Sequence, residues 1–210
     1  MVLTLISLAL ILANPAISIL PVDARGLLAR HEMSLENRYQ VSSVNKVFKD
    51  NILLTLKYMS GQVRSKEDIV WDEIEAPMTY EFSLNPGEKF AFHDDLLAEY
   101  ADNLVRTTNA HFNLSDWFKS DGYLVGDGVC HFASLIYWTA KDAGLTAVAP
   151  QNHDFASIPD VPREYGVAVY VNPYLGTGEM QNLYIINTRE KPVTFVFEYK
   201  DDILSLSVVE

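Results

Sequence analysis

The stretch GDGVCHFAS, residues 126–134, is the best-defined part of this 210-residue chain, because two glycines lead into a run without glycine or proline. The glycines predict a turn, and the run after them predicts a helix over residues 129–143. Gly144 follows directly and is a natural C-terminal cap. Residues 126–144 are therefore predicted to form a turn, a helix and its C-terminal cap.

The predicted helix has two distinct faces, since residues three and four positions apart are neighbours on a helix. The apolar stripe that we expect to face the core consists of Phe132, Ala133, Ile136 and Ala140. Cys130 falls on another face, together with Ser134, Tyr137 and Lys141. The thiol is therefore not required to be buried with the stripe. Asp127 is expected to cap the helix.

Outward from this helix, most of the remaining signals are strand-like, and helical patterns lie mainly in the middle of the chain. A second, shorter helix is predicted over residues 96–105, after the polar triplet His93-Asp94-Asp95. Alternating or β-branched patterns predict strands at 51–59, 69–74, 78–84, 166–171, 182–187, 193–199 and 203–209. This order favours an α+β fold in which an antiparallel sheet packs with a central helix that carries Cys130 at its N-terminus.

Composition excludes several classes of function. The net charge of −12 makes nucleic acid an improbable partner, because an acidic chain repels a polyanion. The single cysteine excludes an intramolecular disulfide and a four-cysteine zinc site. No cofactor motif is present. The sequence does not indicate an oligomeric state.

The N-terminal segment is apolar. Residues 2–13 are too few to span a bilayer comfortably and match the apolar region of a signal peptide, although the usual basic residues before it are missing. We therefore expect residues 1–24 to be a signal peptide or an N-terminal membrane anchor, and the protein to be exported; a buried first helix or strand is the alternative. Residues 25–79 are expected to form an N-terminal extension or subdomain, and residues 80–210 the main domain.

Chemistry is plausible at one place, the start of the predicted helix. A thiol in the first helical turn faces unpaired N–H groups and the positive end of the helix dipole, both of which favour the thiolate. Cys130 is thus a candidate nucleophile and His153 a candidate general base, with Asp154 as a group that orients the histidine. Backbone amides at Gly128 and Val129 are candidate oxyanion donors, and His131 is a weaker candidate for that role.

Several segments, in the same order, resemble the VanW-like family of bacterial envelope proteins, which takes its name from vancomycin-resistance clusters. The resemblance covers residues 80–209, and nothing before that is recognisable. The matching pieces are FSLNPGEKFAF (82–92), GY (122–123), GDGVC (126–130), the helix to AGL (143–145), NH (152–153) and IINT (185–188). The resemblance implies an extracytoplasmic role in cell-envelope or peptidoglycan biology, but no established reaction.

Two departures from the family pattern affect the candidate site. The family usually has glutamine after the cysteine, where this chain has His131, which puts an oxyanion donor in doubt. The family also tends to carry Asp-Ala-Thr where Gly166-Val167-Ala168 stands here, and Asn152 or Asp154 is a candidate substitute for that aspartate. A cysteine at a helix start followed by a histidine near a strand also resembles transglutaminase-like and papain-like thiol enzymes, which is an analogy only.

Two function classes therefore remain open. The first is a cysteine-dependent hydrolase or acyl transferase that acts on peptidoglycan-type amide bonds through Cys130 and His153. The second is a non-catalytic envelope module that binds peptidoglycan or a partner protein, with Cys130 packed as a small apolar side chain. A metal site formed by Cys130, His153 and one of the other histidines (His93, His111 or His131) has no recognised ligand spacing, so we predict no metal.

Overall fold

The computed structural model describes residues 25–122, 125–169 and 178–210 of the chain. The predicted signal peptide or anchor over residues 1–24 lies outside these described residues. Within the described ranges, no helix combines the length and the apolar character needed to cross a membrane.

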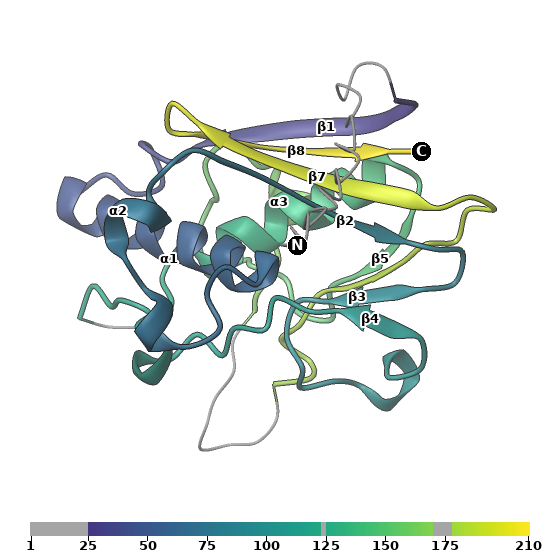
Figure 1. Ribbon diagram of the computed structural model, residues 1–210, viewed down its shortest axis with the longest axis horizontal. Helices are drawn as coiled ribbons and strands as arrows, with labels where there is room; N and C mark the ends of the chain where they lie inside the picture. The colour runs from purple at the N-terminus through teal and green to yellow at the C-terminus, as the bar shows by residue number, and fades with distance from the viewer. Residues whose placement is uncertain (1–24, 123–124, 170–177) are drawn as a thin grey trace, which may run out of the picture.

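The larger of two sheets is fully antiparallel and has the strand order β1-β8-β7-β2 (Figure 1). Its strands are β1 (Leu27–Ser34), β2 (Met78–Leu84), β7 (Val193–Lys200) and β8 (Ile203–Val209). The predicted strands 78–84, 193–199 and 203–209 are thereby confirmed. Asp201 and Asp202, both with positive φ, form the tight turn between β7 and β8 that such a hairpin requires.

The smaller sheet has the order β4-β3-β6-β5 and is mixed, because β3 and β4 are parallel. Its strands are three residues each: β3 (Lys89–Ala91), β4 (Leu104–Arg106), β5 (Thr146–Val148) and β6 (Tyr184–Ile186). β6 lies within the predicted strand 182–187. The fold class is α+β, as predicted, with two sheets in place of the single sheet that we expected.

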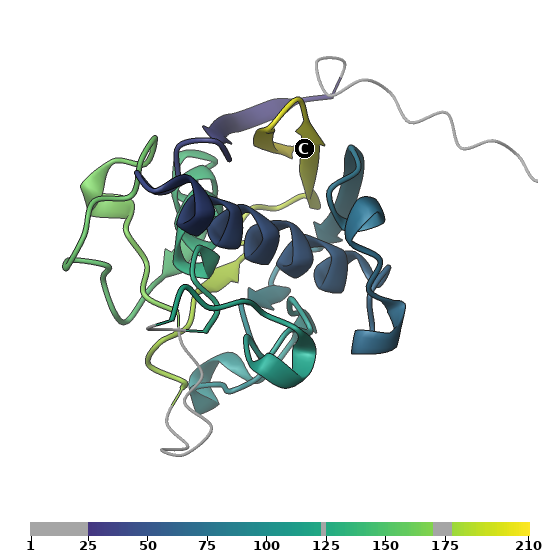
Figure 2. The same ribbon diagram turned by 90° about the vertical axis from the view of Figure 1, so that its left-hand side faces the viewer.

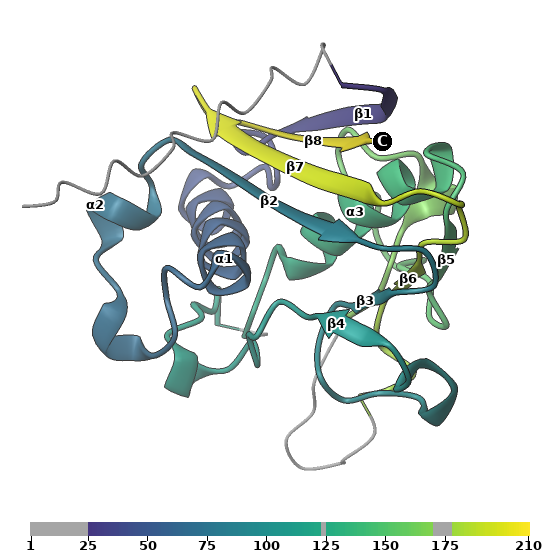
Figure 3. The same ribbon diagram turned by 45° about the vertical axis from the view of Figure 1, so that its right-hand side comes forward.

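Helix α3 (Val129–Asp142) lies between the two sheets, in contact with β1 and β8 on one side and β5 on the other. The longer helix α1 (Ser42–Ser60) contacts α3 and is seen along its length in Figure 2. Figure 3 shows both helices below the larger sheet. The short helical pieces are α2 (Trp71–Ile74), η2 (Lys66–Asp68), η3 (Ala98–Tyr100), η4 (Leu114–Asp116) and η5 (Arg163–Tyr165).

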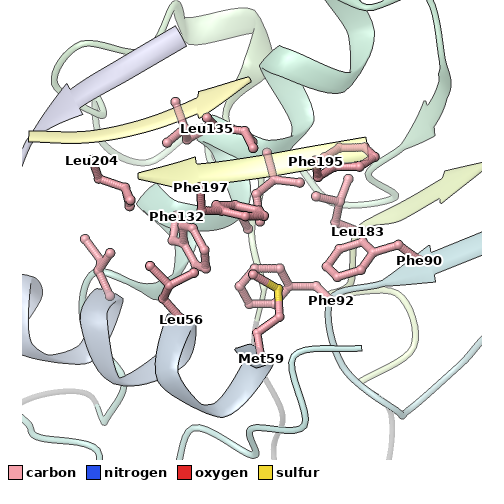
Figure 4. Packing of buried hydrophobic residues seen from close by; sticks show 14 of the residues in the cluster. Leu56, Met59, Phe90, Phe92, Phe132, Leu135, Leu183, Phe195, Phe197 and Leu204 are labelled. Atoms are coloured by element: carbon pink, nitrogen blue, oxygen red, sulfur yellow. The ribbon is translucent and has the colours of Figure 1, made fainter. Parts of the chain in front are cut away.

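The core contains a group of phenylalanine rings among aliphatic side chains and lies where α1, α3 and both sheets meet (Figure 4). Phe195 and Phe197 of β7 are fully buried, and Phe132 of α3 packs edge-on against Phe197 with 5.7 Å between ring centroids. The apolar stripe predicted for this helix is confirmed, since Phe132, Ala133, Ile136 and Ala140 are all buried. Burial of this stripe fixes α3, and therefore its first turn, against the larger sheet.

The predictions of strands at 51–59 and 69–74 were wrong. Residues 51–59 belong to α1, and 71–74 form α2. Positions 50 to 59 of α1 are buried on every side, so the apolar residues lose the spacing that distinguishes a helix from a strand. The helix ends at Gly61, whose positive φ lets its amide and that of Gln62 bond back to the last turn.

Two further predictions fail for local reasons. Residues 96–105 are not a helix, because only η3 and the start of β4 form there and Asn103 takes a positive φ between them. Of the predicted strand 166–171, the described part makes a single bridge, from Val167 to Asn152. The remainder of that strand, from residue 170 on, lies outside the described residues.

The N-terminal part of the described chain is joined to the rest through both a sheet and the core. β1 pairs along its length with β8, at the opposite end of the sequence, and α1 packs against α3. Residues 25–79, expected to be an extension or subdomain, therefore share one hydrophobic cluster with residues 80–210.

Candidate functional site

The turn before α3 depends on two glycines in the left-handed region, Gly126 with φ 89° and Gly128 with φ 93°. Gly128 also lies directly against α1. A Cβ atom placed on Gly128 would sit 2.7 Å from the backbone oxygen of Phe48 and 2.8 Å from its Cα. Only glycine allows both the conformation and this contact, so α1 fixes the position at which α3 begins.

Asp127 does not cap α3, contrary to prediction. Gly128 occupies the N-cap position, and it has no side chain that could accept a hydrogen bond from the first helical turn. The Asp127 carboxylate instead accepts a hydrogen bond from the amide of Asp121, and its backbone carbonyl accepts one from the Asn51 side chain. Burial raises the pKa of Asp127 to about 6. Its role is thus to close the turn and tie it to α1.

Cys130 lies in the first turn of α3, and its thiol donates a hydrogen bond to the carbonyl of Val169, with 3.4 Å between sulfur and oxygen. Cys130 as a residue is half-buried. Desolvation of the thiol raises its pKa to about 11, and the nearby Asp127 charge adds to the effect. We expected the helix N-terminus to lower this pKa; burial outweighs the helix dipole. The resting thiol is therefore protonated.

This pKa predicts the reactivity of the resting protein. The rate of Cys130 alkylation by iodoacetamide should rise with pH toward a midpoint near 11, above the value of about 8.5 for a free thiol. At pH 7 the reaction should be on the order of a hundredfold slower than with a free thiol. Mass spectrometry of samples quenched across the pH range measures the rate, with the denatured protein as control. A native midpoint below that of the denatured control contradicts the prediction.

The geometry of His153 fixes the tautomer of its neutral ring. Its Nδ1 lies 3.1 Å from the carbonyl oxygen of Ala156. Because a carbonyl only accepts, Nδ1 carries the proton in the neutral ring, and Nε2 is left with a free lone pair. Burial lowers the pKa of His153, which favours this neutral form. The ring is therefore held in the tautomer that a general base requires, and the Ala156 carbonyl orients it.

Neither candidate substitute for the orienting aspartate, Asp154 or Asn152, has a hydrogen bond to the His153 ring within the described part of the chain, and both are exposed. Asp154 is exposed, and its backbone carbonyl accepts a hydrogen bond from Arg163. Gly166 stands where the family tends to have aspartate, and it packs directly against the histidine, since a Cβ there would lie 3.2 Å from the His153 Cβ. The Gly166 amide donates a hydrogen bond to the carbonyl of Arg163. The Ala156 carbonyl thus holds the position that an acidic side chain was expected to fill.

His131 is buried in the wall beside these groups, with 5% of its surface exposed. Its ring packs edge-on against Phe48 at 5.1 Å and against His153 at 6.1 Å between centroids. Burial lowers its pKa to about 3, and the positive charge of Arg38 contributes. Its Nδ1 has no hydrogen-bond partner among the described residues. His131 is therefore a neutral ring with an unused polar atom.

A substitution of His131 should change how stability depends on pH. A buried neutral histidine stabilises the protein above its unfolded pKa of 6.5, and this contribution is lost as pH falls toward its folded value of about 3. The native protein should lose about 1.4 kcal/mol per pH unit over that range on account of His131. His131→Phe removes the loss, so between pH 7 and pH 5 it should gain about 2 kcal/mol relative to wild type. Urea unfolding at both values measures this; parallel stability curves would refute it.

These groups meet in one pocket of about 230 Å³. Four of the sequence-predicted residues line it: Gly128, Cys130, His131 and His153. The other lining residues are Arg38, Tyr39, Phe48, Gly126, Asp127, Phe155, Ala156 and Ser157. Asp154 and Val129 are not among them. No hydrogen bond joins Cys130 to His153 within the described part of the chain, since each binds a backbone carbonyl instead.

The amides at the helix start differ in availability. The Val129 amide donates to the carbonyl of Gly126, which removes it as an oxyanion donor. The amides of Gly128 and Cys130 make no backbone hydrogen bond to other described residues. The pair of donors that the turn leaves open is therefore Gly128 and Cys130, rather than Gly128 and Val129 as we expected.

A metal centre has no support in the described residues, which contain no group of three histidine, cysteine, aspartate or glutamate side chains arranged to hold an ion. His93 and His111, the other histidines considered as ligands, are used elsewhere. His93 bonds the carbonyl of Gln181, and His111 pairs with Asp116.

The model of one protein family, described as VanW like protein, matches residues 76–209. The chain belongs to the VanW-like family. The suspected resemblance is thus confirmed, and the family is one that is associated with vancomycin resistance and the bacterial cell envelope. Searches of curated proteins and of solved structures gave no significant match. The family match includes the turn, α3 and His153, but not α1.

Six lining residues were not predicted from the sequence: Arg38, Tyr39, Phe48, Phe155, Ala156 and Ser157. Three of them precede the matched region, in or just before α1, and nothing in the sequence brings that segment to the start of α3. Phe155 carried a local signal, since it lies two positions from His153 and stacks on its ring at 4.0 Å between centroids.

Proposed function

We propose that this VanW-like protein acts outside the cytoplasm on peptidoglycan-type peptides, as a cysteine-dependent hydrolase or acyl transferase. The observation that carries the proposal is the convergence of Cys130, His153 and the open amides of the α3 start in one pocket. In this proposal residues 2–13 direct export or tether the protein to the membrane, and residues 80–210 carry the chemistry with the support of 25–79.

The proposed reaction starts from a neutral thiol and a neutral imidazole. When the substrate carbonyl binds, Nε2 of His153 takes the thiol proton as Sγ forms a bond to the carbonyl carbon. The amides of Gly128 and Cys130 stabilise the oxyanion. The imidazolium then gives its proton to the leaving amine, the carbon–nitrogen bond breaks, and a thioester remains on Cys130. Water or a second amine, deprotonated by His153, attacks the thioester and releases the thiol.

The test uses purified peptidoglycan fragments that contain intact stem peptides, incubated with the protein and with Cys130→Ala. Liquid chromatography and mass spectrometry should show either amide cleavage or exchange onto an added amine, with the wild-type protein only. Cleavage that persists in Cys130→Ala, or fragments left unchanged by wild type, would contradict the proposal.

A second candidate is a binding module without catalysis, and one observation favours it. The thiol of Cys130 is bonded to Val169, and burial raises its pKa to about 11, which is also how a packed structural cysteine behaves. Under this alternative the protein co-sediments with insoluble peptidoglycan, and Cys130→Ala binds as well as wild type. Fragments that bind but are never cleaved or transferred would select the binding module.

A further inference from the structure

Two residues that line the Cys130 pocket each have a buried side-chain nitrogen atom without a partner among the described residues: Nδ1 of His131 and Nε of Arg38. Only four buried side-chain nitrogen or oxygen atoms of the described residues are unpartnered, and the other two are hydroxyls on the larger sheet. An unpaired buried polar group costs about 1–3 kcal/mol, so two in one pocket require an explanation.

Arg38 is held rigidly by its other nitrogens. Nη1 donates to the carbonyl of Pro159 at 2.9 Å, and Nη2 bonds Asn37 and forms an ion pair with Asp160. Arg38 is 2% exposed. Since the guanidinium is always charged, Nε–H is a fixed donor that is left over after these contacts. The ion pair with Asp160 also balances the charge of Arg38.

The interior of the pocket is consequently close to neutral. Burial keeps the thiol protonated and both histidines uncharged at neutral pH, since it raises the pKa of Cys130 and lowers those of His131 and His153. The remaining charge in the wall is the Asp127 carboxylate, whose pKa is about 6. A carboxylate ligand would meet this negative charge, whereas the carbonyl oxygen of an amide carries no charge and still accepts hydrogen bonds.

The lining of the pocket also includes aromatic side chains with exposed surface. Phe155 is 79% exposed and stacks on His153, while Tyr39 is 49% exposed and packs on Phe48. Exposed aromatic side chains around a pocket provide apolar area for an aliphatic group. The lining therefore combines residues that have unpartnered buried nitrogen atoms with residues that have exposed apolar surface.

We propose that this pocket binds an uncharged peptide segment. Its carbonyl oxygens accept hydrogen bonds from the Nδ1–H of His131, in the tautomer that carries the proton on that nitrogen, and from the Nε–H of Arg38, and its aliphatic side chain contacts Phe155 and Tyr39. The inference rests on the proposed function in taking the Cys130 pocket as the ligand site. It adds the class of ligand, a neutral amide rather than a free carboxylate, and assigns His131 to binding.

The experiment uses Cys130→Ala protein, so that binding is measured without chemistry, and two probes of similar size: N-acetylalanine methylamide and N-acetylalanine. The ¹⁵N signals of the histidine rings are followed by NMR during titration. The methylamide should shift the His131 signal and bind at least roughly tenfold more tightly than the carboxylate. Equal affinities, or a carboxylate that binds more tightly, would overturn the proposal.

Two substitutions at His131 separate binding from packing. His131→Gln keeps polar atoms at this position and should retain binding within about threefold, while His131→Phe keeps the ring packing and should weaken binding by roughly three- to tenfold. If the unpaired Nδ1 is merely structural, or is satisfied by water alone, His131→Phe binds the methylamide as well as its parent does, and the proposal fails.

Phe155→Ala supports the test if the His131 variants do not fold, because Phe155 is too exposed to matter much for stability. This change should weaken binding of the methylamide severalfold, and unchanged affinity would contradict the assigned contact. Because every readout is binding, a failure here leaves the Cys130 reaction to be judged separately. Amide binding without acyl transfer would instead contradict only the catalytic proposal.

Discussion

Replacing Gly128 with alanine is expected to destabilise the protein by about 3 kcal/mol and to displace the start of α3. About 1–2 kcal/mol arises from an L-residue in the left-handed region. The remainder comes from the new methyl group, which would lie 2.7 Å from the Phe48 oxygen, a backbone atom that cannot rotate away. Urea unfolding of the variant and wild type measures the change.

Gly61→Ala is the matched control for this substitution. Gly61 also has a positive φ, of 75°, but a Cβ there would meet nothing within 4 Å. It should therefore lose only the conformational part, about 1 kcal/mol. Equal losses in the two variants would mean that the contact between α1 and the turn does not constrain the site.

His153→Ala is expected to slow the formation of acyl-Cys130 by about 10²–10⁴-fold, the usual contribution of a general base. The resting thiol is protonated, so its attack on a carbonyl depends on a group that takes the proton during the reaction. The rate is measured with the thiobenzyl ester of N-acetylalanine by quenched-flow mass spectrometry. The alkylation midpoint of Cys130 should stay near that of wild type, because no hydrogen bond joins the two side chains at rest.

His111→Ala controls for the loss of a histidine. His111 pairs with Asp116 and does not line the pocket, so the acylation rate should stay within about twofold of wild type. If His153→Ala also reacts at the wild-type rate, His153 is not the base, whatever its tautomer.

The parts of the fold that the sequence predicts are those with a local cause. β2 follows from strict alternation, and β7 with β8 from β-branched residues on either side of Asp201-Asp202. Gly128 and Gly144 flank α3, so both ends of this helix can be predicted from the sequence. In α1, burial on all sides removes the regular spacing of apolar and polar residues that would distinguish a helix from a strand. Strands of three residues such as β4 and β5 are defined by their partners rather than by their own residues.

The residues of the candidate site also differ in whether a local sequence signal predicts them. Cys130, His131, His153 and Gly128 could be found because the glycine turn and the histidines are visible in the sequence, and all four line one pocket. The pKa direction of Cys130 could not be predicted, since it depends on burial by distant segments. The same reason hides Arg38 and Phe48, which reach the pocket only because β1 pairs with β8 and α1 packs on α3.

Catalysis by Cys130 is tested by peptide mapping with mass spectrometry. Native protein is exposed to the thiobenzyl ester of N-acetylalanine at neutral pH and quenched in acid. We expect a single acetylalanyl group in thioester linkage on Cys130, which hydroxylamine removes. This group should be absent from Cys130→Ala and much slower to form in His153→Ala. A thiol that stays unmodified in the native protein, and is acylated only after denaturation, would contradict catalysis by Cys130.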